Sequence, residues 1–289
     1  MSNARVRTWR TQFTPWRSAG NRTETGATAD EIVQSTGWVF NNETGKQLTL
    51  ADFVETGDKE VRRYMRQFGF TPEQLAPLTL LEIGSGIGRM TASFTQQCAQ
   101  VIATDVDAAF LERCHETVGQ HGRPERLRTT HVTDGRTLQV GDRSVDVVFS
   151  YITLQHCERS DALSLTREAV RVARDGATIM LNYRSWVPAD VVLIPLGVLV
   201  RALWRLPIVG GRLSQQRWAT RFGWQANRLS PDDVLEYLYK QPGVEQRLGE
   251  ITVHHSAKRA RSAKQVGVTV QPLNRVNASH WWLVIHLKG

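Results

Sequence analysis

Three glycines at alternate positions follow an apolar run, and their spacing indicates chemistry more clearly than any other stretch of the chain. The run is residues 80–83, and the glycines are Gly84, Gly86 and Gly88. Glycine has no Cβ and tolerates positive φ, so a strand that ends in such a turn can bring its backbone against a bound small molecule. Glu82 stands two residues before the first glycine. The pattern predicts a ligand-binding turn between a strand and a helix, with a carboxylate beside it.

The spacing of the glycines distinguishes two kinds of ligand. Dinucleotide-binding turns follow G-x-G-x-x-G and receive a pyrophosphate at the N-terminus of the next helix. In this chain the third glycine comes one residue earlier, and an acidic residue at the strand end does not suit an anionic ligand. It does suit a cation. We therefore expect S-adenosylmethionine, a sulfonium with an amino-acid tail, rather than a nicotinamide dinucleotide.

Strand and helix patterns alternate around this turn. Such alternation is typical of a parallel sheet with crossover helices. We expect an α/β fold: a Rossmann-like, doubly wound sheet of seven mostly parallel strands. The expected strands are residues 79–83, 101–105, 127–132, 145–150, 177–181, 244–255 and 281–287.

Composition divides the 289 residues into three parts. Residues 1–37 are polar and mixed, and we expect an irregular N-terminal tail. Residues 38–78 carry helical patterns and are expected to form an N-terminal helical extension. Residues 79–289 are expected to form the main domain. Within it, residues 186–229 combine an apolar run with several arginines and are expected to be a lid inserted between the fifth and sixth strands.

Two interpretations of the lid segment are compatible with its residues. In one it is a helical cap that closes the pocket, with Arg201 and Arg205 one turn apart on its outer face. In the other its apolar face lies in a membrane interface, and its arginines contact the phosphate of a lipid-linked or phosphorylated acceptor. The second interpretation implies peripheral contact with a membrane.

Charge and cysteine content limit the possible partners of the protein and its cellular compartment. The net charge is +8, and residues 184–289 hold 15 Lys and Arg against 6 Asp and Glu. This surplus indicates either an anionic partner or a solvated arginine-rich face. Three cysteines without ligand-like spacing argue against a disulfide framework and favour a cytoplasmic location. The eight histidines show no metal-ligand spacing, so we expect no metal, and no apolar run reaches the ~20 residues that span a bilayer.

The order and spacing of these patterns resemble those of class I S-adenosylmethionine-dependent methyltransferases. The resemblance covers residues 50–185 well and the final two strands loosely. Within that family the chain is similar to bacterial methyltransferases of small molecules and glycans. Those often begin with a glycine-containing turn, here Thr56-Gly57, and carry Leu-Gln-His after the fourth strand, here Leu154–His156.

The resemblance implies a cofactor site at the carboxyl ends of the first four strands. The glycine turn would surround the methionine moiety, and Asp105 would accept hydrogen bonds from both ribose hydroxyls. Val106 would lie against the adenine, and Asp134-Gly135 would contact the adenine amino group. Ser150 and Tyr151 would lie beside the sulfonium. The cofactor residues implied in this way are Glu82, Gly84, Ser85, Gly86, Gly88, Asp105, Val106, Asp134, Gly135 and Ser150.

His156 is the main candidate for a catalytic residue. The positive sulfur already activates the donor, so the protein must mainly position the acceptor and remove its proton. Histidine titrates near neutral pH and suits that role. Family members that keep such a histidine do not all use it as the base, so a structural role is the alternative. The phenol of Tyr151, close to the cofactor, is a second catalytic candidate.

The residues after the fourth strand restrict the acceptor. Enzymes that methylate nucleobase amino groups usually carry Asn/Asp-Pro-Pro-Tyr/Phe there, whereas residues 150–153 read Ser-Tyr-Ile-Thr. Carbon-5 pyrimidine enzymes need a Pro-Cys nucleophile, and Cys157 follows histidine instead. We expect methylation of a hydroxyl on a small molecule, a sugar or a lipid-linked glycan, with S-adenosylhomocysteine as the second product. The alternatives are an RNA methyltransferase that uses the basic C-terminal third, and a non-catalytic cofactor-binding subunit.

Overall fold

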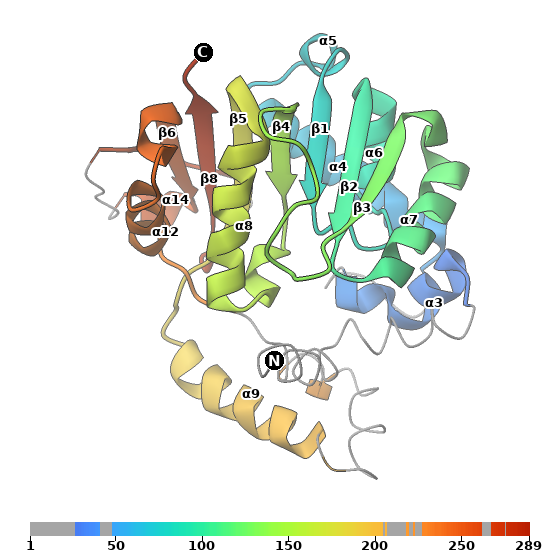
Figure 1. Cartoon of the computed structure of the whole chain (residues 1–289). Coiled ribbons are helices and arrows are strands. Elements are labelled where there is room, and N and C mark those ends of the chain that lie inside the picture. The colour runs from blue at the N-terminus through green and yellow to red at the C-terminus, as the bar shows by residue number, and fades with distance from the viewer. Residues whose placement is uncertain are drawn as a thin grey trace. The chain divides into compact units, whose positions relative to one another are not determined.

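The chain forms two compact units (Figure 1). One contains residues 54–186 and 226–289, and the other contains residues 1–53 and 187–225. The first unit holds the whole sheet, and the second contains the helices α3 (Ala29–Phe40) and α9 (Asp190–Trp204). The computed structural model describes residues 27–40, 48–204, 206, 218–219, 222, 227–261, 267–274 and 276–289.

Within the described residues the sheet has eight strands, in the order β3-β2-β1-β4-β5-β8-β6-β7. The neighbours from β3 to β5 are parallel, and β8 is antiparallel to both β5 and β6. The prediction of a doubly wound, mostly parallel α/β fold is confirmed. The strands are β1 (Thr79–Ile83), β2 (Gln100–Asp105), β3 (Leu127–His131), β4 (Val145–Ser150), β5 (Ala173–Arg184), β6 (Leu248–His255), β7 (Thr269–Pro272) and β8 (His280–Leu287).

The predicted number of seven strands is wrong by one. The additional strand, β7, forms between the last two predicted strands, where no strand was expected. It pairs in parallel with β6, with Val253 opposite Val270. Without it β6 would be the edge of the sheet, and β7 pairs with the part of β6 from Thr252 to His255.

Each face of the sheet has its own apolar core. On one face α8 (Arg159–Val172) and α12 (Pro231–Tyr239) pack against the strands, and on the other face lie α4 (Leu50–Gln67) and α6 (Thr91–Gln97). Figure 1 shows α8 in front of the sheet and α4 behind it. Trp281 and Trp282 on β8 contribute one side chain to each core, because successive strand residues point to opposite faces. The further helices of this unit are α5 (Pro72–Leu75), α7 (Ala108–His121), α13 (Val244–Arg247), α14 (Ala257–Ala260) and the 3-10 turns η1 (Pro124–Arg126) and η2 (Leu154–His156).

Helix α3 occupies part of the segment that was expected to be irregular. Ala29, Ile32 and Val33 are buried at the i, i+3, i+4 spacing of a helix face. The Thr28 hydroxyl accepts from the N–H of Glu31 at 3.3 Å, and the Glu31 carboxylate accepts from the N–H of Thr28 at 2.8 Å. This capping box and the apolar stripe outweigh the polar composition, which corrects the prediction from residue 29 onward. Residues 1–26 lie outside the described residues.

The predicted lid segment contains α9, which forms over the expected apolar run. Residues 205, 207–217, 220–221 and 223–226 of this segment lie outside the described residues. Its role as a lid stays a prediction. No helix in the described part of the chain is both long enough and apolar enough to cross a bilayer.

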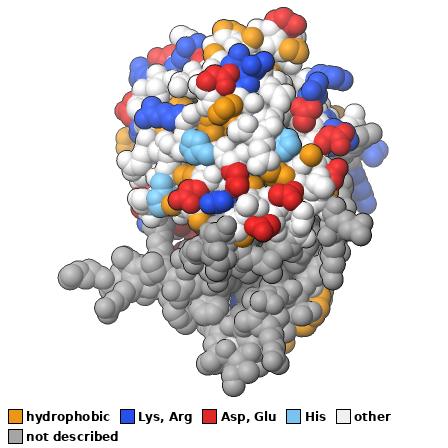
Figure 2. All heavy atoms as spheres, turned by 90° about the vertical axis from the view of Figure 1, so that its right-hand side faces the viewer, with side chains coloured by type: hydrophobic (Ala, Val, Ile, Leu, Met, Phe, Trp, Pro, Cys, Tyr) orange, Lys and Arg blue, Asp and Glu red, His pale blue; other side chains and the backbone are white. Residues whose placement is uncertain are grey.

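Charged side chains of both signs are interspersed over the face seen in Figure 2. Part of the basic surplus of the C-terminal third serves the fold. Arg247 donates to the carbonyl of Ala173 at 2.6 Å and pairs with Asp175 at 3.0 Å, where α8 ends. A cation in this place stabilises the unpaired carbonyls of a helix C-terminus.

Helix α4 continues through Thr56-Gly57, where the resemblance predicted a turn. The glycine serves close packing instead: a Cβ on Gly57 would lie 2.2 Å from the carbonyl oxygen of Arg89. The Arg89 guanidinium pairs with Glu60 at 2.6 Å and donates to the Thr56 hydroxyl at 3.3 Å. Gly57 therefore lets α4 lie directly against the loop that follows β1.

The substitution Gly57→Ala is expected to lower the free energy of unfolding by about 1–3 kcal/mol, because the new methyl group must displace backbone. The matched control is Gly119→Ala in α7, where a Cβ would meet nothing within 4 Å. There alanine is expected to stabilise the protein by up to about 1 kcal/mol, since it is the better helix former. Urea unfolding of both variants measures the difference, and equal stabilities would contradict the close contact at Gly57.

Candidate active site

The loop after β1 holds its three glycines in the left-handed region, with φ of +77° at Gly84, +55° at Gly86 and +94° at Gly88. A Cβ on Gly84 would lie 2.0 Å from the side chain of Thr153, and one on Gly88 would lie 3.1 Å from Sγ of Cys114. A Cβ on Gly86 would meet nothing within 4 Å. The glycine loop is therefore packed at both ends and open in the middle. Ser85, between the first two glycines, is buried and its N–H donates to the carbonyl of Thr104 at 3.0 Å.

Glu82, near the end of β1, is a buried carboxyl close to this loop. Its Oε2 accepts a hydrogen bond from the Thr91 hydroxyl at 2.7 Å. Burial raises the pKa of Glu82 to about 7, although the Thr91 hydrogen bond and the charge of Arg89 favour the ionised form. A cation placed beside such a group favours its ionised form. Glu82 therefore suits the cationic ligand that its position predicted.

Asp105 ends β2, and its carboxylate reaches the glycine loop. Oδ2 accepts from the N–H of Gly86 at 2.9 Å, and Oδ1 accepts from the N–H of Asp107 at 3.0 Å. Burial raises the pKa of Asp105 to about 6, and these two hydrogen bonds act in the opposite direction. The next residue, Val106, leaves 48% of its surface exposed. The open middle of the glycine loop, an acid and an exposed apolar side chain are thus brought together.

The burial of Glu82 makes stability depend on pH in a defined direction. The pKa of Glu82 in the folded protein, about 7, lies above its ordinary value of 4.5, so the fold favours the protonated form of this side chain. The contribution of Glu82 to the free energy of unfolding is therefore complete below pH 4.5 and is lost as the pH rises towards 7. Glutamine cannot ionise. The effect of Glu82→Gln on the free energy of unfolding is therefore expected to be about 2–3 kcal/mol more favourable at pH 8 than at pH 5. Urea unfolding at both pH values checks this, and an equal effect at both would contradict the raised pKa.

The loop after β3 is folded by Asp134 itself. Its Oδ1 accepts from the N–H groups of Arg136 and Thr137, both at 2.8 Å, and its Oδ2 accepts from the Thr137 hydroxyl at 2.7 Å. Gly135 lies in this turn with φ of +69°. Asp134 therefore closes its own turn. The predicted contact with an adenine amino group would use the acceptor positions that remain on the carboxylate, and it stays a prediction.

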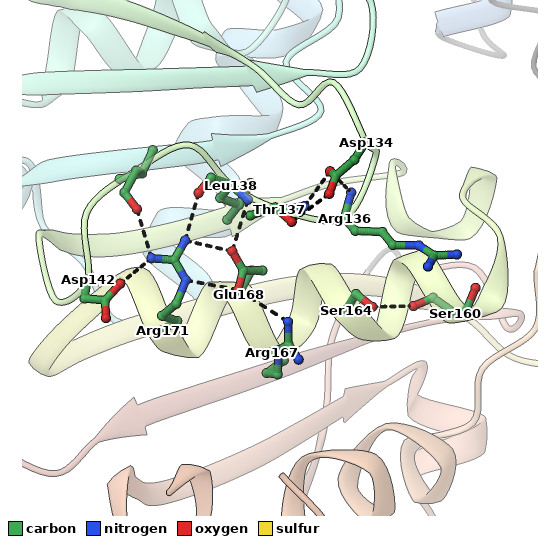
Figure 3. A network of polar contacts seen from close by, with 11 residues as sticks. Asp134, Arg136, Thr137, Leu138, Asp142, Ser160, Ser164, Arg167, Glu168 and Arg171 are labelled. Atoms are coloured by element: carbon green, nitrogen blue, oxygen red, sulfur yellow. Dashed lines mark hydrogen bonds and ion pairs between the residues drawn. The ribbon is translucent and has the colours of Figure 1, made fainter. Parts of the chain in front are cut away.

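An ion pair on α8, with Glu168 buried and Arg171 partly exposed, fastens the continuation of this loop to the helix (Figure 3). Glu168 accepts from the N–H of Leu138 at 3.1 Å and from the guanidinium of Arg171 at 2.7 Å. Arg171 also donates to the carbonyls of Leu138 and Val140, at 2.8 and 3.0 Å, and pairs with Asp142. The loop that carries Asp134 is therefore anchored to the helix layer, and both charged groups of the anchor are satisfied.

Two residues that were predicted to lie beside the sulfonium, Ser150 and Tyr151, stand at the end of β4 and make contacts within the fold. Ser150 is fully buried, and its hydroxyl donates to the carbonyl of Ile83 at 3.0 Å, which ties β4 to β1. Tyr151 stacks on Trp282 with ring centroids 5.6 Å apart, and its hydroxyl donates to Glu60 at 3.3 Å. Burial moves the pKa of the Tyr151 phenol above its ordinary value, so it stays protonated and does not suit the role of a base. Ser150 and Tyr151 thus take part in the packing of the fold, and their place beside the sulfonium stays a prediction.

His156 ends η2, in the connection between β4 and α8. Its Nε2 lies 3.1 Å from the side-chain amide nitrogen of Gln155, so in the neutral ring Nε2 accepts this hydrogen bond and is the nitrogen that can take up a proton. Ile152, earlier in the same connection, has a φ of +56°, which is strained for a β-branched residue. Strain of this kind persists where the surrounding contacts impose it.

Two residues hold this connection from either side. The side chain of Asn227 donates to the carbonyls of Leu154 and Cys157, at 2.6 and 3.0 Å. On the other side the Thr153 hydroxyl donates to the carbonyl of Gly84 at 3.2 Å. The turn that carries His156 is therefore joined to the glycine loop and held in place by a residue far away in the sequence.

Residues 81–181 match the protein family described as a methyltransferase domain. They run from β1 to β5 and contain the glycine loop, Asp105 and His156. This part of the chain is a methyltransferase domain. Among the residues that the structure describes, no three or more His, Cys, Asp or Glu side chains of the chain gather as metal ligands would.

Curated relatives match the methyltransferase domain over part of their own length. Phosphoethanolamine N-methyltransferase 1 of Triticum aestivum is 28% identical over 157 residues, which are 52% of this chain and 30% of the relative. A biotin biosynthesis bifunctional protein of Cellvibrio japonicus is 34% identical over 131 residues, 42% of this chain and 24% of the relative. An uncharacterized methyltransferase of Mycolicibacterium vanbaalenii is 30% identical over 121 residues, 40% and 43% of the two chains. The chain thus spans less than half the length of these relatives.

Solved structures share the fold of the methyltransferase domain. Magnesium protoporphyrin IX methyltransferase from Synechocystis, solved with bound S-adenosylhomocysteine, aligns with a TM-score of 0.51 at 14% identity, over 90% of this chain and 98% of that chain. Phosphoethanolamine N-methyltransferase 1 from Haemonchus contortus, in complex with phosphoethanolamine and S-adenosylhomocysteine, aligns with a TM-score of 0.50 at 15% identity, over 92% of this chain and 51% of that chain. At these identities the likeness is one of fold.

Four residues that position the candidate site were not predicted: Glu60, Arg89, Thr153 and Asn227. Arg89 directly follows the last glycine of the loop, a position from which its pairing with the preceding helix could have been suspected. Asn227 is 70 residues from Cys157, and no local pattern points to their contact. Contacts of this range depend on the tertiary fold and leave no periodic signal in the sequence.

Proposed function

We propose that the methyltransferase domain transfers the methyl group of S-adenosylmethionine to a hydroxyl group. The observation that carries the proposal is the hydrogen bond of 2.9 Å between the Gly86 N–H and Asp105 Oδ2, with Val106 exposed beside it. It joins an open stretch of backbone to a carboxylate that can also accept from a ribose, as acids at this position do in nucleotide-binding folds.

The residues present fit a cationic nucleoside. Glu82 and Asp105 are two carboxyls whose burial raises their pKa values to about 7 and about 6, so a nearby positive charge favours their ionised forms. The proposal assigns the methionine moiety to Glu82 and the glycine loop, the ribose to Asp105 and the adenine to Val106. Bound there, S-adenosylmethionine supplies a methyl group that its positive sulfur already activates.

The acceptor side of the proposal rests on the turn after β4. Residues 150–153 lack the motif that holds a nucleobase amine, and the turn after them carries His156. Its Nε2 accepts a hydrogen bond from the Gln155 amide, which uptake of a proton at Nε2 would replace. A hydroxyl is a weak nucleophile until its proton is removed, and a positioned base contributes a factor of about 10²–10⁴ to such a step. We therefore assign His156 as the base, and a small molecule, a sugar or a lipid-linked glycan as the acceptor.

Calorimetry tests the donor part of this proposal. S-adenosylmethionine and S-adenosylhomocysteine are each expected to bind at one site per chain, with release of protons near neutral pH as Glu82 and Asp105 ionise. The absence of binding by both compounds would overturn the donor assignment. Binding without methyl transfer to any acceptor would instead support a non-catalytic cofactor-binding subunit.

The acceptor part is tested with pairs of compounds that differ only in a hydroxyl or an amine, such as a monosaccharide and its amino sugar, with radiolabelled S-adenosylmethionine as donor. Label on the hydroxyl member supports the proposal. Label only on the amine would replace it with N-methylation, the activity named for the phosphoethanolamine relatives. An RNA acceptor would be recognised by binding that weakens steeply with salt, because phosphate contacts release counterions.

A further inference from the structure

Helix α9 is apolar on all sides, yet only part of its surface is covered. Val200 is buried and packs against Ala219 and Phe222 of the same unit. Another part of the surface is exposed: five aliphatic side chains leave between 39 and 66% of their surface open. They are Val191, Val192, Ile194, Val198 and Leu199. We call this set the apolar stripe of α9.

The spacing of the apolar stripe shows that it forms a continuous surface. Val191, Val192, Val198 and Leu199 stand at i, i+1, i+7 and i+8, positions that share one side of a helix. Trp218 in the same unit is also half exposed. A helix that is apolar all round is normally buried in a protein core or in lipid, and a contiguous exposed patch of this kind marks an interaction surface.

The charge of the surrounding segment indicates what covers the stripe. From residue 191 to residue 231 the chain contains six arginines and neither aspartate nor glutamate. It also contains three tryptophans. Aliphatic residues that enter an apolar phase, tryptophans at its boundary and cations for phosphate groups are the combination that binds the surface of an anionic membrane. A protein partner would have to present a comparably extended negative surface beside an apolar one.

We propose that the unit containing α9 docks on the surface of an anionic lipid bilayer, with the apolar stripe of α9 inserted among the upper acyl chains. The 15 residues of α9 span about 22 Å at 1.5 Å per residue, less than the ~30 Å thickness of the hydrocarbon core. The helix therefore lies along the interface and does not cross it. This docking does not depend on the proposed methyl transfer.

Sedimentation of the full chain with lipid vesicles tests the docking. The protein is expected to bind vesicles of phosphatidylcholine mixed with phosphatidylglycerol and to bind pure phosphatidylcholine vesicles more weakly. Replacing two residues of the stripe together, Val192→Ser and Leu199→Ser, is expected to weaken binding to the anionic vesicles about tenfold or more. The matched control is Tyr239→Ser, an exposed apolar residue at the end of α12, which is expected to bind as the unaltered protein does.

Three outcomes would overturn the proposal. The first is a wild-type chain that sediments with neither kind of vesicle. The second is a double variant that binds the anionic vesicles as tightly as the Tyr239→Ser control. The third is a wild-type chain whose mass by light scattering is that of a dimer and falls to a monomer in the double variant, without vesicle binding, because the stripe would then be an interface between two copies. Thermal unfolding of both variants verifies that they fold.

Discussion

The Asp105→Ala protein is expected to bind S-adenosylmethionine at least about 100-fold more weakly than the wild type. The Asp105 carboxylate already accepts from the Gly86 N–H at 2.9 Å and can accept in addition from two ribose hydroxyls. Hydrogen bonds to a charged acceptor contribute about 1.5–3 kcal/mol each, so the loss of two weakens binding by about 3–6 kcal/mol, or two to four factors of ten. Alanine also leaves the Gly86 N–H without its partner and loosens the open middle of the glycine loop.

Calorimetric titration with S-adenosylmethionine measures this effect, and Asp107→Asn is its matched control. Asp107 caps α7 by accepting from the N–H of Ala109 at 3.0 Å, and asparagine keeps that acceptor while it removes a negative charge close to Asp105. The control is expected to bind within about threefold of the wild type, since only a screened charge is lost. Equal affinities in the two variants would show that Asp105 acts as a general negative charge and does not hold the ribose.

The His156→Ala protein is expected to bind S-adenosylmethionine within about threefold of the wild type but to turn over about 10²–10⁴-fold more slowly. His156 would remove a proton from the acceptor and make no contact with the donor that its loss could weaken. The pH profile supplies a second readout. The decrease in rate on the acid side that reports a protonated base is expected to disappear in the variant, because no histidine is left there to titrate.

The control for this prediction is His286→Ala. His286 is an exposed histidine of β8 whose ring lies 3.0 Å from the Thr178 hydroxyl on β5, away from the carboxyl ends where the glycine loop and η2 lie. It is expected to keep wild-type turnover and the wild-type pH profile. Wild-type turnover in His156→Ala would remove the histidine as the base. Parallel losses of turnover and donor affinity would assign it a structural role in the turn that Asn227 and Thr153 hold.

Much of the sheet could be predicted because its central strands are buried on both faces. β1 and β4 have the predicted bounds, since a continuous apolar run between turn residues has few other ways to be buried. The meeting of Asp105 with the glycine loop was predictable for a related reason. Adjacent parallel strands end at the same edge of a sheet, so the residues that follow β1 and β2 must be neighbours. A capping box such as the one between Thr71 and Gln74 at the start of α5 can be recognised in a sequence, because it depends on local contacts alone.

The errors share a different physical origin. The stacking of the Tyr151 ring on Trp282 was not predicted, because a separate strand supplies Trp282. Gly57 is predicted to form part of a turn, whereas in the structure it lies in a helix, where its lack of a Cβ avoids a clash with the Arg89 backbone. In each case a partner distant in the chain decides the outcome. Strand β7 also forms because its four residues pair with the open edge of β6, and not because of their own β-propensity.

The position of β8 has a consequence for the way the protein is made. This strand lies between β5 and β6, so two non-adjacent parts of the sheet are joined only by residues 280–287. A ribosome releases those residues after every other strand has emerged. Until then the nascent chain presents two open strand edges, and exposed edges recruit other strands. Until β8 has been made, the chain therefore needs protection from the strands of other molecules.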